Sequence, residues 1–146
     1  MKAVIQRVIS SSVTVNGEVH SHIGKGLLVL VGFEKGDKRE FVDFLADKLI
    51  NLRIFDKDGK MSLSVKDTGG EVLLVSQFTL AGDTSKGRRP DFTKSLHPEV
   101  AKECYNQLVS AVQRELGTDR VRTGVFGGRM VVSIENDGPV TIVIDK

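Results

Sequence analysis

A short apolar run at the centre of the chain, Val72–Val75, is followed by polar side chains before the apolar character ends. Its branched residues are typical of a strand buried on both faces of a sheet. Extended backbone beyond the run would place Gln77 and Thr79 on one face, and Ser76 and Phe78 on the other. Because a buried amide or hydroxyl needs a hydrogen-bond partner, two interpretations stay open. Either a core strand surfaces at the sheet edge with its polar groups bonded to backbone, or the strand end faces a ligand.

An Asn-Gly turn and two further apolar runs predict strands in the first part of the chain. Residues 3–9 and 12–15 have the composition of strands. Asn16-Gly17 then tolerates the positive φ angles of a two-residue type I′ turn, which predicts a hairpin with residues 18–20. Residues 26–33 predict another buried strand.

Apolar residues at helical spacing predict two main helices. We expect the first to begin at Asp37, with Glu40 three residues later in an arrangement like a capping box. The second carries Pro98 near its first turn and ends just before Gly117, where glycine commonly stops a helix.

Turn residues divide the remaining segments. Asp58-Gly59 predicts a turn between two extended stretches, and the last part of the chain predicts three short strands joined by tight turns at Gly127-Gly128 and Asp137-Gly138-Pro139. We therefore expect one α/β (α+β) domain, residues 1–146, with a curled, mixed and largely antiparallel sheet and two main helices.

Composition and charge limit the cellular location and the type of partner, but they do not indicate a function. The net charge of +2 permits an anionic partner and requires none. Lys2 and Arg7 leave no room for the apolar core of a signal peptide, and no run is long enough for a membrane helix. The single Cys104 excludes a disulfide within the chain. We expect a cytoplasmic protein with no membrane partner.

Side chains for conventional catalysis are few. His20 and His22 share one strand face as two metal ligands might, but no third ligand is evident, so we expect no metal. Cys104 falls inside the second predicted helix, where a small buried thiol is the usual explanation. Gly124–Gly128 resembles a phosphate loop but lacks the lysine and helix that follow one, so a hairpin turn is expected.

The loop Lys86-Gly87-Arg88-Arg89 lies just beyond the polar end of the central strand. It could hold phosphates, or it could be a solvated loop tip.

Several motifs spread over the chain form one recognisable set. They are Ser76-Gln77-Phe78-Thr79-Leu80, Asn136-Asp137-Gly138-Pro139-Val140-Thr141, Ala3-Val4-Ile5-Gln6-Arg7-Val8, the Leu27–Gly32 run, Gly87-Arg88-Arg89-Pro90-Asp91-Phe92 and Met130. Taken together, they resemble the D-aminoacyl-tRNA deacylase family over essentially the whole chain. The chain departs from the family pattern at Lys94-Ser95-Leu96, where smaller residues are expected.

The resemblance implies a homodimer that hydrolyses the ester joining a D-amino acid, or glycine, to the 3′ end of a tRNA, without a cofactor and without a DNA partner. It implies that Gly138-Pro139 is a cis unit that reaches into the partner subunit's site and excludes L side chains, with Arg7 as an orienting contact. The residues implied at the site are, for catalysis, Ser76, Gln77, Phe78 and Thr79, and for substrate binding, Gly138, Pro139, Arg7, Met130, Arg88, Pro90 and Phe92.

Two hypotheses describe the chemistry. Thr79 is either a covalent nucleophile, for which no activating base is evident, or residues 76–79 act by position and backbone hydrogen bonds while the substrate's 2′-hydroxyl assists a water. A competitor from another class is a non-catalytic module that grips RNA ends or phosphates through Lys86, Arg88 and Arg89. A third interpretation is a purely structural dimerisation domain.

Overall fold

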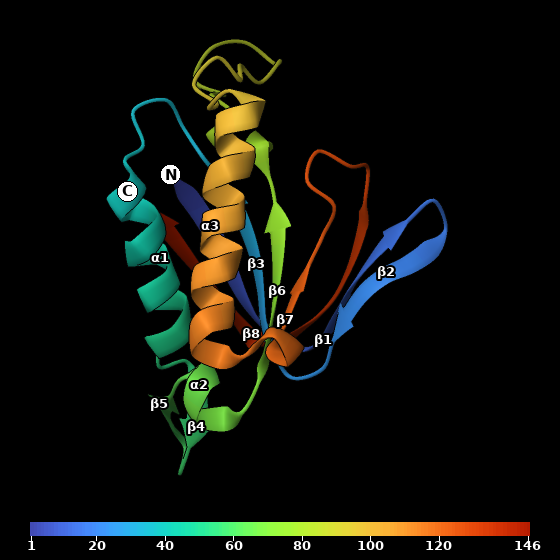
Figure 1. The fold of residues 1–146 in the computed structure, drawn as a ribbon, viewed down its shortest axis with the longest axis vertical. Helices are drawn as coiled ribbons and strands as arrows, with labels where there is room; N and C mark the ends of the chain where they lie inside the picture. The colour runs from blue at the N-terminus through green and yellow to red at the C-terminus, as the bar shows by residue number, and fades with distance from the viewer.

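The computed structural model describes all residues, 1–146, and its main sheet is built around one long strand, β1 (Lys2–Val15) (Figure 1). One edge of β1 pairs with β3 (Gly26–Gly32) along its first half and with β2 (Glu18–Ile23) along its second half. The other edge pairs with β8 (Val131–Asp145) along almost its whole length. Because one strand serves two successive partners on the same edge, the sheet curls between them.

Two parallel strands complete the sheet. β6 (Glu71–Ser76) pairs with β3, and β7 (Val121–Thr123) pairs with β6. The order across the sheet is β2-β1-β3-β6-β7, with β8 beside β1. Every pair that involves β1 is antiparallel, so the predicted mixed and largely antiparallel sheet is confirmed.

Two long helices lie side by side over one face of the sheet, α1 (Arg39–Asn51) and α3 (Pro98–Leu116) (Figure 1). α3 begins at Pro98 and is followed by Gly117, as predicted. A short helix that the sequence did not predict, α2 (Val65–Thr68), precedes β6. The core beneath the helices includes Ile5, Leu27, Val29, Leu45, Leu49, Val72, Leu74, Leu108 and Val112.

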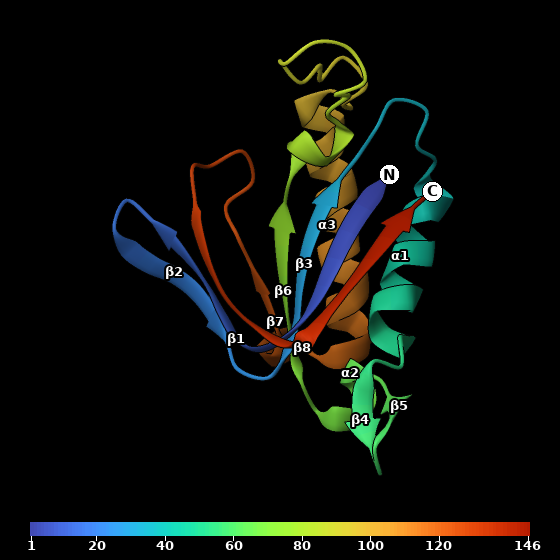
Figure 2. The same cartoon turned by 180° about the vertical axis from the view of Figure 1, so that it is seen from behind.

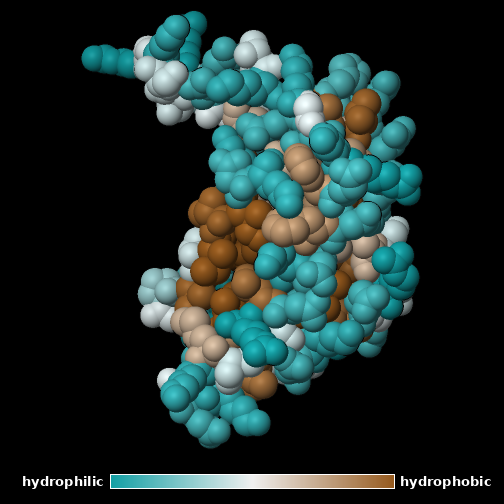
Figure 3. Space-filling view, turned by 90° about the vertical axis from the view of Figure 1, so that its left-hand side faces the viewer, coloured by the Kyte–Doolittle hydropathy of each residue, from teal (hydrophilic) through white to brown (hydrophobic).

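The opposite face of the sheet is also apolar, and Figure 2 views the molecule from this side. A second buried cluster there contains Val8, Leu28, Leu73 and Val75. The prediction that the central strand is buried on both faces is therefore confirmed. Figure 3 shows hydrophobic residues gathered on one side of the molecule, below a hydrophilic segment that overhangs them.

Two of the hairpins predicted from turn residues are present. The hairpin predicted at Gly124–Gly128 is wrong, because β7 pairs with β6 and β8 pairs with β1. Asn16 and Gly17 have φ values of 52° and 82°, which join β1 to β2. Asp58 and Gly59, at 53° and 77°, join β4 (Phe55–Lys57) to β5 (Lys60–Leu63). None of the helices is long and apolar enough to span a membrane.

The predicted cap of the first helix is wrong. α1 begins at Arg39, and Lys38 precedes it without a capping side chain. The Asp37 carboxylate instead accepts hydrogen bonds from the Met1 ammonium at 2.6 Å and from the Glu34 amide at 2.8 Å. A charged ammonium is a stronger hydrogen-bond donor than a helix amide, which explains why the Asp37 carboxylate binds Met1 instead of capping α1.

The three short strands predicted for the end of the chain are also wrong. Only β7 is short, and β8 runs unbroken through Asp137-Gly138-Pro139. The sequence 3–15 likewise forms one strand rather than two. The β1–β8 register shifts between Gln6 and Ser10. The Gly-Pro residues therefore form an irregularity within the strand pair and not a turn that ends the strand.

Candidate active site

A cavity of about 760 Å³ lies where β6 leaves the sheet. Its walls come from the ends of β3 and β6, from the segment 92–101 and from the segment 126–132. Ten of its twenty lining residues are hydrophobic, so the interior suits a ligand with apolar or aromatic parts. Five of the predicted site residues line it, namely Ser76, Gln77, Phe78, Phe92 and Met130.

The predicted extended backbone through Thr79 is wrong, because Gln77 turns the chain. The Gln77 amide still donates to the Val31 carbonyl at 2.7 Å, but its φ of −146° and ψ of 83° lead into a 3-10 helix, η1 (Phe78–Ala81). Gln77 and Thr79 nevertheless stay together, since the Thr79 hydroxyl donates to the Gln77 side-chain oxygen at 2.8 Å.

A glycine on the neighbouring strand allows this turn to pack closely. A Cβ at Gly32 would lie 2.5 Å from the Gln77 carbonyl oxygen and 3.2 Å from the Leu80 Cβ. Any side chain at position 32 would therefore push the start of η1 away from the sheet.

Three aromatic rings surround the cavity. Phe78 and Phe92 meet edge to face, with ring centroids 5.2 Å apart, and both are exposed. Phe126 also lines the cavity and packs on Tyr105, with ring centroids 5.7 Å apart. Exposed rings at a concave site offer faces on which a nucleobase or another ring can stack.

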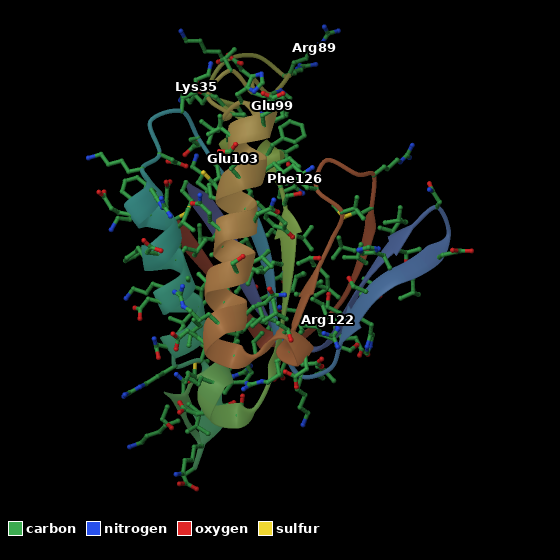
Figure 4. The ribbon with its side chains drawn as sticks, in the orientation of Figure 1. Lys35, Arg89, Glu99, Glu103, Arg122 and Phe126 are labelled. Atoms are coloured by element: carbon green, nitrogen blue, oxygen red, sulfur yellow. The ribbon has the colours of Figure 1, made fainter.

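The basic loop extends beyond the cavity rather than lining it. A pair of backbone hydrogen bonds between Asp83 and Asp91 closes its base, at 2.8 and 2.9 Å. A hydrogen bond from Lys94 at 2.9 Å holds the pKa of the Asp83 carboxyl well below its usual range. Arg88 and Pro90 are exposed and do not line the cavity, and Figure 4 shows Arg89 at the outer end of the molecule.

The Gly138-Pro139 unit also lies outside the cavity of its own chain. Its peptide bond is cis, Gly138 has a φ of 112°, and both residues are exposed. A Cβ at Gly138 would lie 3.1 Å from the Arg7 Nη2 atom. Arg7 thus packs directly against this part of β8.

Arg7 is 5% exposed and is held from two sides. Its Nη1 atom donates to the Ile54 carbonyl at 2.6 Å and to Asp56 at 3.2 Å. Its Nε atom lies 3.0 Å from an Asp137 carboxylate oxygen, although without the alignment of a hydrogen bond. Two carboxylates therefore balance one buried guanidinium beside Gly138.

The cavity lining contains no carboxylate, and its only ionisable side chains are Lys35 and His97. Cys104 lies outside the lining, and burial raises the pKa of its thiol, which disfavours the reactive thiolate. No group of three or more His, Cys, Asp or Glu side chains lies close enough to hold a metal ion.

The sequence reasoning missed several lining residues, including Lys35, His97 and Phe126. Phe126 belongs to the glycine-rich segment that we interpreted only as a turn. Ser95 and Leu96 also line the cavity, so the departure from the family pattern at 94–96 falls within its wall. That departure was the one sequence signal pointing to this segment.

Comparison with known sequences gives the class of protein, a hydrolase that acts on aminoacyl-tRNA. The chain belongs to the D-Tyr-tRNA(Tyr) deacylase family, whose sequence model matches residues 4–145. The D-aminoacyl-tRNA deacylases of Thermoanaerobacter sp. (strain X514) and Flavobacterium psychrophilum are 56% and 53% identical to it over 147 residues, which cover 100% of this chain and 97% of each relative.

Solved structures agree with the fold. The structure titled "c-Myc DNA Unwinding Element Binding Protein" superimposes with a TM-score of 0.95 at 42% identity, covering 100% of this chain and 99% of the other. "Structural Analysis of a probable eukaryotic D-amino acid tRNA deacylase" describes a second neighbour, with a TM-score of 0.86 at 21% identity over 99% and 98% of the two chains. At that identity the second comparison supports the fold alone.

Proposed function

We propose that this chain, as a single domain of residues 1–146, hydrolyses the ester bond of D-aminoacyl-tRNA. Water attacks the ester carbonyl, the bond to the 3′-terminal ribose breaks, and free D-amino acid and tRNA are released. The observation that carries the proposal is the cavity formed around Ser76, Gln77 and Phe78 in a chain of the deacylase family.

The catalytic part of the proposal rests on backbone geometry. The Gln77 amide is already used by the Val31 carbonyl. The Phe78 amide begins η1, so it has no acceptor within that helix and can donate to the oxyanion that forms when water attacks. Ser76 and Gln77 then orient the ester, and the proposed reaction uses no cofactor.

The attacking water must give up a proton, and no carboxylate lines the cavity to accept it. The ribose 2′-hydroxyl next to the ester is a group of the substrate that can accept and relay that proton. Thr79 as a covalent nucleophile is the weaker alternative, because its hydroxyl is bonded to Gln77 and it does not line the cavity.

The chirality filter comes, in this proposal, from a second copy of the chain. Gly138 and Pro139 are exposed and lie outside their own cavity. On the same strand, Val131, Ile134 and Val143 are apolar residues with exposed fractions of 65%, 40% and 67%, and a second copy of the chain would cover them. In the homodimer, the backbone of the partner subunit's Gly138 and Pro139 faces the α-carbon and leaves no space for an L side chain.

A wall of this kind must be held rigidly. Arg7 supplies that support because it is buried against Gly138 and fixed by Asp56, Ile54 and Asp137. Glycine carries no side chain, so a filter that works by exclusion also admits glycyl-tRNA. Met130 and Phe92 form cavity walls around the substrate, while Arg88 and Pro90 contact the tRNA outside the cavity.

The test is release of free tyrosine from D-tyrosyl-tRNA by the purified protein, measured beside filter binding of the same tRNA. We expect catalytic release with many turnovers per site. Binding without release would contradict the proposal and favour the non-catalytic module. Competition with single-stranded DNA belongs in the same assay, since one structural neighbour has a DNA-binding title. We expect DNA to compete only weakly.

A further inference from the structure

We propose that Lys35, assisted by His97, binds the phosphodiester that joins the last two nucleotides of the tRNA. The inference rests on the proposed function and adds an anion subsite to the rim of the same cavity. It concerns a group that the ester chemistry does not use, so it can fail while the deacylase activity stands.

The charge of the cavity lining is the first support. Lys35 and His97 are its only ionisable residues, and both are exposed, so they lie at the rim rather than in the apolar interior. No carboxylate among the lining residues opposes them. An apolar pocket whose rim carries a lysine and a histidine, with no carboxylate in its lining, is complementary to a nucleoside that carries one phosphate.

The second support is that the charge of Lys35 is uncompensated. The acidic residues nearest to it in sequence, Glu34 and Asp37, form ion pairs with other cations. Asp37 lies 2.6 Å from the Met1 ammonium, and Glu34 lies 3.4 Å from both that ammonium and the Lys2 amine. Lys35 itself forms no ion pair and no side-chain hydrogen bond, and its ammonium is therefore free to bind an anion.

The third support is the fixed position of the Lys35 backbone. Its amide donates to the Lys94 carbonyl at 2.8 Å, and Glu34 pairs with Ser95 in an isolated antiparallel bridge. These contacts join the loop after β3 to the wall that holds Phe92 and Ser95. Figure 4 shows Lys35 close to the first turn of α3, at the end of the molecule where Arg89 also lies.

The chemistry of the substrate completes the argument. With the ester at Ser76–Phe78 and the terminal base among the aromatic rings, the next group along the tRNA is a phosphodiester with one negative charge. It must leave the cavity across the rim, where Lys35 and His97 lie. The following phosphates then run toward the exposed basic loop, residues 86–89.

The experiment compares two substrates that differ in this phosphate, D-tyrosyl-tRNA and 3′-O-(D-tyrosyl)adenosine. For Lys35→Ala we expect KM for the tRNA to rise by about tenfold, as for the loss of one charge-assisted hydrogen bond, with kcat little changed. The logarithmic salt dependence of tRNA binding should flatten by about one unit. Hydrolysis of the adenosine ester should stay within about twofold of wild type, and Lys35→Arg should restore tRNA hydrolysis.

Lys25→Ala is the matched control, because it removes one exposed lysine that precedes β3, at the opposite end of that strand from Lys35. An unchanged KM of Lys35→Ala for D-tyrosyl-tRNA would overturn the inference. Equal losses on both substrates would overturn it too, since they would indicate a general structural role. A wild-type protein that cleaves neither substrate would instead overturn the proposed function itself.

Discussion

Among single residues, the polar groups at the end of β6 divide into those that face the cavity and one that supports them. Ser76 and Gln77 line the cavity, whereas Thr79 does not and is bonded to the Gln77 side chain. We therefore propose Thr79 as a positioning residue, whose effect on turnover would pass through Gln77.

Thr79→Ala should keep most of the turnover of D-tyrosyl-tRNA. It removes one neutral hydrogen bond, worth about 1 kcal/mol, so a loss of about three- to tenfold is expected in single-turnover hydrolysis. Thr79→Ser keeps a hydroxyl and should remain near wild type. A near-complete loss in Thr79→Ala that serine restores would instead support the nucleophile.

Some of these residues could be predicted from the sequence and others could not. Ser76 and Gln77 stand out because polar side chains interrupt a strand that its apolar pattern already identifies. Lys35 and His97 come from two separate segments, which meet through backbone contacts such as the bridge between Glu34 and Ser95. No local pattern encodes that pairing, and sequence reasoning therefore missed them.

Among secondary-structure elements, the link between α3 and β6 holds the cavity in place. Tyr105 on α3 is buried, and its hydroxyl donates to the Leu74 carbonyl at 2.7 Å, two residues before Ser76. Its ring also supports Phe126 in the cavity wall. Tyr105 thus ties the covering helix to both sides of the site.

Tyr105→Phe should lower the free energy of unfolding by about 1 kcal/mol at neutral pH. The loss is modest because the Leu74 carbonyl keeps its hydrogen bond from the Gly124 amide at 2.9 Å. Urea denaturation measures it, and an unchanged midpoint would contradict the assigned role.

The same residue predicts a pH dependence. Burial raises the pKa of the Tyr105 hydroxyl above its ordinary value of 10.0, so the folded state resists ionisation. Its contribution is fully present below pH 10 and is lost as the pH rises above that value. Tyr105 is the only tyrosine, so tyrosinate absorbance reports it alone and should appear together with alkaline unfolding. Ionisation at the ordinary pKa in the folded protein would disprove this.

The elements themselves show which features the sequence encodes locally. The Asn16-Gly17 and Asp58-Gly59 hairpins were predicted because positive φ angles restrict the residue type at each turn. The continuity of β8 through Gly138-Pro139 was missed because it depends on pairing with β1, a strand from the other end of the chain. Asp37 was misread for the same reason, since its partner is the distant Met1 ammonium.

At the scale of the whole molecule, the proposed site is built from two copies of the chain. The cavity and the Gly138-Pro139 unit are both present in one chain but lie apart, so the proposed chirality filter needs a partner subunit. Val143 on β8 pairs with Val4 on β1 and is 67% exposed, in a position that a second copy would cover.

Val143→Glu should weaken the proposed homodimer by placing a charge at the covered surface. Light scattering should show the wild type at twice the 16.0 kDa chain mass and the variant shifted toward the monomer. Hydrolysis per chain should fall for the variant at low protein concentration and recover as concentration rises. Met61→Glu, at an exposed apolar residue of β5, is the control. A monomeric wild type with full activity would contradict the two-copy site.

The most direct test of the central claim is the ratio of hydrolysis rates for matched D- and L-tyrosyl-tRNA, measured with the purified wild-type protein. The account predicts rapid release from the D-ester and, for the L-ester, a rate close to spontaneous hydrolysis, with chelator making no difference to either. Comparable rates for the two esters would contradict the exclusion of L side chains by the partner subunit's Gly138 and Pro139.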